Sequence, residues 1–152
     1  MFNFLKKKEV SLVEHQYKNL FLFLPSNWIY EKEEGDLEAC YDKKSSSTLR
    51  LHIITFLMSQ NKTPEGDLLK GMDNDINITT KNGYTLTNPK YVDYIENGHK
   101  IILVTWKLID NSKEEKIMAV ITYTVLSSEK DSEKEKSQIN LIQKSLENAK
   151  FV

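Results

Sequence analysis

Cysteine is nearly absent from this chain, since Cys40 is the only one among 152 residues. A single cysteine excludes an internal disulfide and every zinc motif that is built from several cysteines, and it fits a reducing compartment. Long apolar runs are absent too. The longest is the five-residue stretch from Leu20 to Leu24, whereas a membrane-spanning helix needs ~18 apolar residues. The sequence therefore predicts a cytoplasmic location without stable membrane insertion.

Charge of one sign is also lacking, because 21 basic side chains oppose 22 acidic ones and leave a net charge of −1. A balanced chain argues against nucleic acid as a partner, since nucleic-acid binders gather lysine and arginine on one face. Apolar residues make up 39% of the chain, enough for an ordinary buried core. We expect a possibly flexible N-terminal segment over residues 1–17, where the order of charged and apolar residues is the reverse of a secretory signal. A single domain follows over residues 18–152.

Alternating apolar and polar residues, interrupted by turn signals, predict a series of short strands. Leu37, Ala39 and Tyr41 share one face of such a strand, and Glu38 and Cys40 share the other. Asn82-Gly83 and Asn97-Gly98 are tight-turn signals. The expected strands cover residues 20–24, 28–30, 37–41, 48–58, 76–80, 84–87, 91–96, 99–110 and 116–127.

Two helices are expected, at Thr63 to about Asn74 and from Ser132 to the C-terminus. Ser132 and Glu135 have capping-box spacing, and a helical stripe of apolar residues runs from Ile139 to Ala149. The strand over residues 99–110 is apolar on both faces, so it needs a covering layer on each side. We therefore expect an α+β fold, with an antiparallel sheet sandwiched between helices in three layers.

The sequence Leu24-Pro25-Ser26-Asn27-Trp28 after the first expected strand, followed by this order of elements, resembles the PsbP-like superfold. That superfold includes photosystem subunits, a Ran-binding nuclear import factor, and bacterial families with effector chaperones and uncharacterised members. The resemblance implies a sheet between helices and a bias toward binding other macromolecules. It implies no catalytic residue.

No catalytic or metal-binding motif is present, and we expect neither a metal site nor a cofactor. Asp73, Asp75 and Asn77 match part of a calcium loop, but the glycine and the final glutamate are missing. The histidines, His15, His52 and His99, fall on separate expected elements, so their spacing predicts no shared site.

The remaining polar candidates have structural explanations. Asp36, Glu38 and Asp42 are best explained as a solvated hairpin edge, since acid–base catalysis needs a cleft that their spacing does not imply. Cys40 is best explained as a structural thiol.

Aromatic residues are the richest binding candidates, because side chains with an apolar ring and a polar edge are enriched at interfaces. Tyr91 and Tyr94 should lie on opposite faces of one strand, so at least one of them is exposed if that strand is at an edge. The candidate binding residues are Trp28, Tyr30, Tyr84, Tyr91 and Tyr94.

Three functions remain open. The first is a non-catalytic domain that binds a protein partner, such as an effector chaperone or a toxin-neutralising immunity protein. The second is a small cysteine-dependent hydrolase using Cys40 with His52 or His99. The third is a carrier of a small molecule or lipid. The missing catalytic motifs favour the first.

Overall fold

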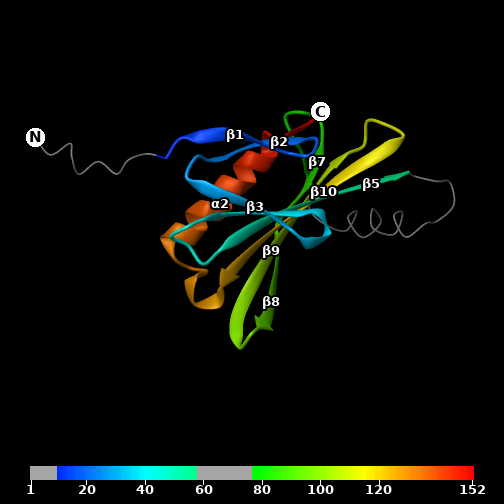
Figure 1. Cartoon of the computed structure of the whole chain (residues 1–152). Coiled ribbons are helices and arrows are strands. Elements are labelled where there is room, and N and C mark those ends of the chain that lie inside the picture. The colour runs from blue at the N-terminus through cyan, green and yellow to red at the C-terminus, as the bar shows by residue number, and fades with distance from the viewer. Residues whose placement is uncertain (1–9, 58–76) are drawn as a thin grey trace, which may run out of the picture.

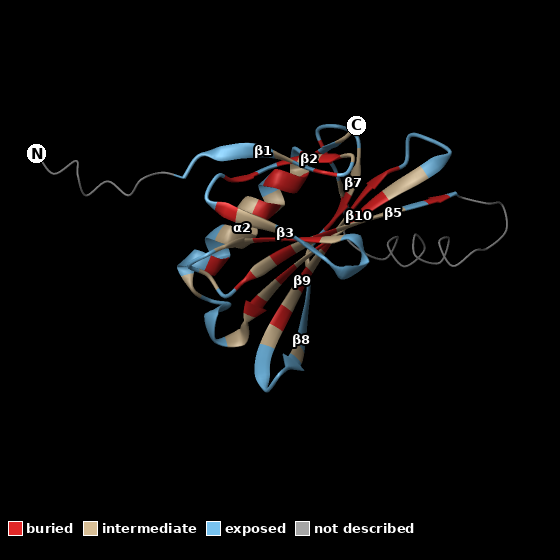
Figure 2. Ribbon diagram, viewed as in Figure 1, coloured by how far each residue is buried: buried red, intermediate tan, exposed pale blue. Residues whose placement is uncertain are grey.

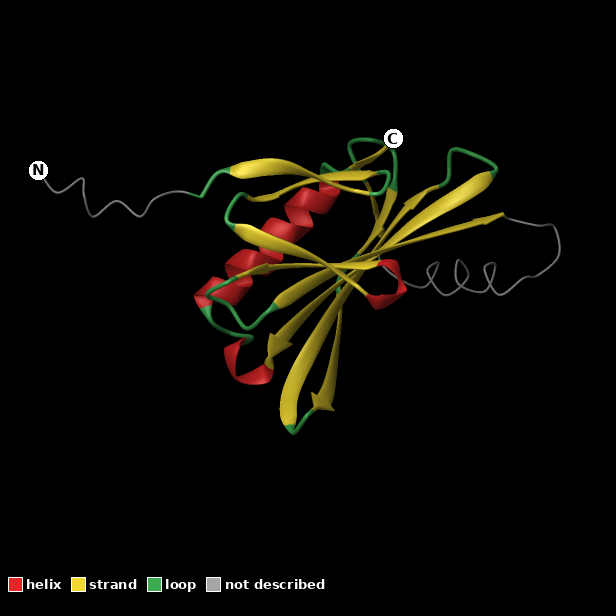
Figure 3. Cartoon of the chain, in the orientation of Figure 1, coloured by secondary structure: helices red, strands yellow, loops and turns green. Residues whose placement is uncertain are grey.

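A computed structural model describes residues 10–57 and 77–152 of the chain. Within these residues the strands form one small and one large antiparallel sheet, and a helix lies against them (Figures 1 and 3). The small sheet has the order β1-β2-β11. The large one has the order β3-β4-β5-β10-β9-β7-β6, with β8 paired to β9 as a side branch. The α+β class and the antiparallel sheet expected from the sequence are confirmed.

The large sheet is built around the long hairpin of β9 (His99–Asp110) and β10 (Glu115–Leu126). Ile121 lies opposite Trp106 on one side and opposite Leu51 on the other, which places these three side chains on one face. We call this the inner face. The other strands of the large sheet are β3 (Trp28–Glu33), β4 (Leu37–Asp42), β5 (Thr48–Leu57), β6 (Asn77–Thr79), β7 (Thr85–Thr87) and β8 (Lys90–Glu96).

The small sheet consists of β1 (Leu12–Tyr17), β2 (Leu20–Pro25) and β11 (Lys150–Phe151). Leu20, Leu22 and Leu24 are fully buried on alternate positions of β2. They belong to the same core cluster as the inner-face residues of the large sheet. The inner surfaces of the two sheets therefore pack together, as alternating burial along a strand requires.

Helix α2 (Glu133–Glu147) packs on the inner face and against β2. The Ser132 side chain caps it by accepting a hydrogen bond from Glu135 N, as the capping-box spacing predicts. The Glu135 carboxylate does not complete the box. It accepts hydrogen bonds from the hydroxyls of Ser47 at 2.9 Å and Tyr123 at 2.8 Å, which fastens the start of the helix to the sheet.

The core lies where β2, the centre of the large sheet and α2 meet, as the buried segments in Figure 2 show. A smaller buried cluster of Phe56, Ile109 and Met118 lies on the outer face. The helix expected from Thr63 to about Asn74 lies outside the described residues, so a third layer stays a prediction. No helix in residues 10–57 and 77–152 is long and apolar enough to cross a membrane.

Both ends of the fold differ from expectation. The sheet begins at Leu12, inside the segment expected to be flexible, because β1 pairs with β2 along its whole length. At the other end, α2 stops at Glu147 instead of continuing to the C-terminus. Ala149 is buried in the core, and Lys150 and Phe151 form β11 beside β2.

Candidate functional site

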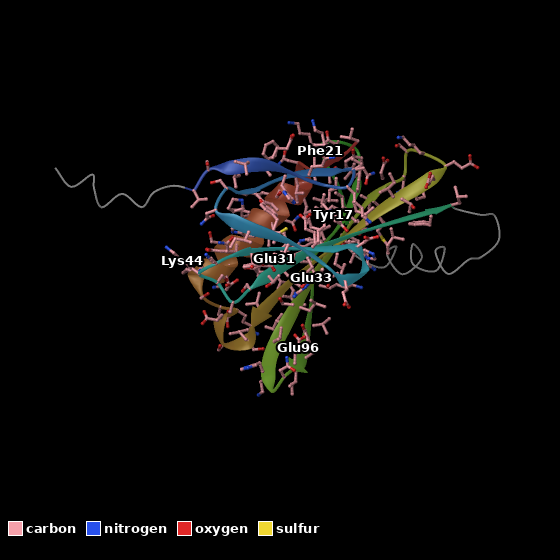
Figure 4. All side chains as sticks on the ribbon, viewed as in Figure 1. Tyr17, Phe21, Glu31, Glu33, Lys44 and Glu96 are labelled. Atoms are coloured by element: carbon pink, nitrogen blue, oxygen red, sulfur yellow. The ribbon has the colours of Figure 1, made fainter. Side chains whose placement is uncertain are left out.

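Strand β8 forms an exposed edge of the large sheet. It pairs with β9 from Lys90 opposite Thr105 to Glu96 opposite His99, and it has no other strand partner among the described residues. Figure 4 shows Glu96 at the far end of this hairpin. Asn97 and Gly98, which join the two strands, both have positive φ angles of 51° and 80°, the geometry of a tight two-residue turn.

Large apolar side chains are exposed along β8. Tyr91 is 58% exposed, Val92 is 53% exposed and Ile95 is 70% exposed. Tyr91 and Val92 are neighbours in the strand and therefore lie on opposite faces. Apolar surface is thus available on both faces of this strand, and exposed apolar patches mark interaction sites.

A groove of about 520 Å³ runs between β8 and α2. Tyr91 and Asp93 line it from β8, and Ile102 and Val104 line it from β9. On the helix side the lining residues include Lys136 and Ile139. The groove is thus mainly apolar on its sheet side, with charged side chains at its margin, and we call it the β8 groove.

The opposite edge of the large sheet has a different character. Strand β3 pairs with β4 alone in the large sheet, and its exposed half consists of Glu31, Lys32 and Glu33 (Figure 4). Charged side chains of this kind protect a sheet edge from pairing with another chain. In β8, by contrast, the charged residues are separated by pairs of aromatic and aliphatic residues, of which Tyr91, Val92 and Ile95 are exposed, so this edge is less protected.

Two of the five candidate binding residues are part of the structural framework. Trp28 is buried in the core cluster. Tyr84 packs edge-on against Phe151, and its hydroxyl accepts a hydrogen bond from Phe151 N at 2.9 Å. Its aromatic ring therefore holds the C-terminal strand in place. Tyr91 and Tyr94 lie on β8, where Tyr91 is exposed and Tyr94 is half-buried.

Tyr30, the fifth candidate, belongs to a polar cluster between the two sheets. Its ring stacks on the His15 imidazole, with centroids 3.8 Å apart and an interplanar angle of 12°. The His15 Nε2 atom is in contact with the Glu38 carboxylate, and the Cys40 thiol donates to the same carboxylate oxygen at 3.8 Å. His15 comes from β1 of the small sheet, whereas the other members come from β3 and β4.

The expectation that Glu38 belongs to a solvated hairpin edge is wrong, because this residue is 8% exposed. Glu38 and Cys40 lie opposite Leu51 and Leu49 on the inner face. The alternation in the sequence placed them on one face of the strand. It did not show that β1, which the sequence did not predict, lies over that face.

Burial is the main cause that raises the pKa of the Cys40 thiol far above its ordinary value, and the charge of Glu38 and its hydrogen bond add to this shift. Burial also raises the pKa of Tyr30 to about 12, with further contributions from Cys40 and Glu38. Cys40 is therefore a protonated thiol at neutral pH, and it lacks the thiolate that nucleophilic attack requires.

The histidines that the hydrolase hypothesis pairs with Cys40 lie elsewhere. His52 is opposite Val120 on the outer face of the large sheet, whereas Cys40 is fully buried on the inner face. His99 is exposed at the end of the β8–β9 hairpin. The imidazole that approaches Cys40 is that of His15, whose nitrogen, with the Glu38 oxygen and the Cys40 sulfur, forms a set of three atoms within 4.8 Å of one another. Sequence spacing gave no signal for this cluster, because its members lie in different sheets.

The antiparallel sheets and the C-terminal helix on their inner face define an α+β fold. No family model and no curated protein sequence matches the chain. Solved structures do match it. LpqN of Mycobacterium tuberculosis, involved in cell envelope biogenesis, is 9% identical with a TM-score of 0.64, covering 99% of this chain and 95% of its own.

The Ran-binding protein Mog1p of Saccharomyces cerevisiae is 9% identical with a TM-score of 0.55, covering 95% of this chain and 97% of its own. A protein from Bacteroides thetaiotaomicron is 14% identical with a TM-score of 0.60 over 88% of this chain. This chain spans about half of the length of that protein, since 45% of it is covered. At such identities these similarities establish the fold alone.

Proposed function

We propose that this domain is a non-catalytic module that binds a protein partner along strand β8. In this proposal the partner supplies an extended segment that pairs with the edge of β8 that faces away from β9. Its apolar side chains contact Tyr91 and Ile95 and enter the β8 groove. This is β-strand addition, in which backbone hydrogen bonds supply affinity and side-chain pockets supply specificity.

The observation that carries the proposal is the exposure of Tyr91, Val92 and Ile95 on a strand that, within residues 10–57 and 77–152, is paired on one edge. Edge strands in monomeric proteins are usually short, charged or covered. The edge at β3 follows this pattern, because its exposed residues include the charged Glu31 and Lys32. Strand β8 departs from it, because several of its exposed residues are apolar. A partner strand on β8 would cover apolar surface that is otherwise in contact with water.

The hairpin geometry identifies the backbone groups that a partner strand would meet. In a two-residue hairpin the residues that flank the turn, here Glu96 and His99, form a hydrogen-bonded pair, and such pairs alternate along the ladder. The backbone N–H and C=O groups of Tyr91, Asp93 and Ile95 therefore point away from β9. These three residues provide the pairing edge.

The similarity to Mog1p supports a protein partner, because that structure is described as Ran-binding. An effector chaperone or an immunity-type protein would use such an edge to recognise one specific chain. We propose a cytoplasmic location on the ground of the lone, buried Cys40 thiol.

Proline at position 93 tests the proposal, because it removes the outward N–H of that residue while leaving the pairing with β9 intact. Asp93→Ala is the matched control, since it removes the same carboxylate but keeps the N–H group. The wild-type chain and both variants serve as baits in affinity purification from source cells. We expect one stoichiometric partner with the wild type and with Asp93→Ala, and its loss with Asp93→Pro. Recovery of the same partner by all three baits, or of none by the wild type, would contradict β8 pairing.

A further inference from the structure

We propose that His15, Glu38 and Cys40 form a binding site for one Zn²⁺ ion that links the small sheet to the large one. The inference does not depend on a protein partner at β8. His15 belongs to β1, which lies in the small sheet, and Glu38 and Cys40 belong to β4 of the large sheet. An imidazole nitrogen, a carboxylate oxygen and a thiolate sulfur are the three ligand types that Zn²⁺ takes in proteins.

The distance between Cys40 and Glu38 fits a tetrahedral ion. Zinc–ligand bonds of about 2.0–2.3 Å place the ligand atoms of a tetrahedral site roughly 3.3–3.8 Å apart. The Cys40 sulfur lies 3.8 Å from Glu38 Oε1, and all three ligand atoms lie within 4.8 Å of one another. His15 Nε2 and Glu38 Oε1 are in direct contact, closer than two ligands of one ion. Side-chain rotations that separate these two atoms by about 1 Å complete the geometry. Binding replaces the proton of the Cys40 thiol with the metal and releases that proton to solvent.

The surroundings of the cluster support a site rather than a chance meeting of side chains. The Tyr30 ring stacks on the His15 imidazole and holds the plane of that imidazole in place. The Tyr30 hydroxyl oxygen is buried and has no hydrogen-bond partner among the described residues. A water molecule on the fourth position of the metal would provide that partner. A buried hydroxyl normally forms a hydrogen bond, so this unpartnered one beside the cluster points to a further group there.

A hollow in the surface reaches Glu38, one member of the cluster. A hollow of about 350 Å³ is lined by Tyr17, Lys32, Asp36 and Glu38, among others. Glu38 thus faces the hollow on one side and the cluster on the other, although its side chain is only 10% exposed. The ion would enter here and would then connect β1 with β4, which raises the stability of the folded state by mass action.

Cobalt(II) substitution tests the site directly, because a thiolate ligand gives a sulfur-to-cobalt charge-transfer band and a tetrahedral site gives intense visible bands. Full-length protein is titrated with Co²⁺ and then with Zn²⁺. We expect one ion per chain, both sets of bands, and displacement of Co²⁺ by Zn²⁺. Cys40→Ser should abolish the charge-transfer band. His15→Gln should weaken Zn²⁺ binding at least about 100-fold, which exceeds the loss typical for a residue that only contacts a metal ligand.

Matched controls separate this site from general affinity for imidazole. His52→Gln and His99→Gln remove the other histidines and should leave the spectrum and the affinity unchanged, while Tyr30→Phe should weaken binding about 10-fold. Zn²⁺ should raise the melting temperature of the wild type and of His52→Gln but not that of His15→Gln. Circular dichroism establishes that each variant is folded. If Cys40→Ser does not fold, the His15→Gln variant tests the proposal alone. This variant is expected to fold, because the His15 side chain is partly exposed. A wild type without the cobalt bands, or equal losses in His15→Gln and His52→Gln, would overturn the proposal.

Discussion

The Tyr123 hydroxyl donates a hydrogen bond of 2.8 Å to the carboxylate of Glu135, at the point where α2 begins and β10 nears its end. Both residues are buried, and Glu135 also accepts from Ser47. This contact joins a helix terminus to the centre of the sheet. It therefore determines how α2 is oriented on the inner face, and α2 provides one wall of the β8 groove.

Removing this hydroxyl should destabilise the fold. Tyr123→Phe leaves the buried Glu135 carboxylate with one fewer donor, and we expect a loss of about 2 kcal/mol in the free energy of unfolding. Urea denaturation measures it. The control is Tyr94→Phe, whose hydroxyl donates to the exposed Glu96 at 3.4 Å, and this variant should change stability by no more than about 0.5 kcal/mol. Equal effects in the two variants would show that the Glu135 contact does not stabilise α2.

Stability should fall at alkaline pH. Burial is the main cause that raises the pKa of Cys40 above its ordinary 9.0 and the pKa values of Tyr30 and Tyr123 above 10.0 in the folded state. These groups therefore contribute fully to the free energy of unfolding below pH about 9. The contribution is lost as the pH rises, because the unfolded chain releases these protons at a lower pH than the folded chain does. Urea midpoints measured between about pH 7 and pH 11 should decline above about pH 9. Tyr123→Phe should make that decline shallower. A flat profile would contradict the burial of these groups.

The C-terminal strand should depend on one tyrosine hydroxyl. Tyr84→Phe removes the bond from Phe151 N at 2.9 Å and the weaker one to Phe151 O at 3.5 Å. We expect a loss of about 1 kcal/mol in unfolding free energy, with faster amide exchange at Phe151. Tyr41→Phe is the matched control, because its hydroxyl donates to the exposed Glu31. Unchanged exchange at Phe151 in Tyr84→Phe would show that β11 is held by other contacts.

The two strands of the long hairpin were predictable from the sequence. Residues 99–110 and 116–127 were expected as a hairpin, and the structure has β9 and β10 at almost the same positions. The N-cap at Ser132 was predictable for a related reason, because capping depends on a short-range hydrogen bond. Local patterns were sufficient wherever the stabilising contacts are themselves local.

Other elements depend on contacts between distant residues. Strand β1 contains Glu14, His15 and Gln16, so its composition resembles that of a loop, and only pairing with β2 makes it a strand. The same cause hid the cluster of His15 with Glu38 and Cys40, because it forms only when the small sheet covers β4. The exposure of Tyr91 followed from its position on an edge strand. The structural role of Tyr84 could not be predicted from the sequence, because it depends on the two-residue strand β11.

The proposed function depends on β8 being the edge that a partner strand occupies. Residue-resolved amide exchange by NMR, on the free chain and on its complex with the captured partner, tests this most directly. Tyr91, Asp93 and Ile95 should exchange rapidly in the free chain and slowly in the complex, because their outward N–H groups then form hydrogen bonds. If these three amides exchange equally in both states while amides of β3 or another surface become protected, the partner binds elsewhere and the central claim is wrong.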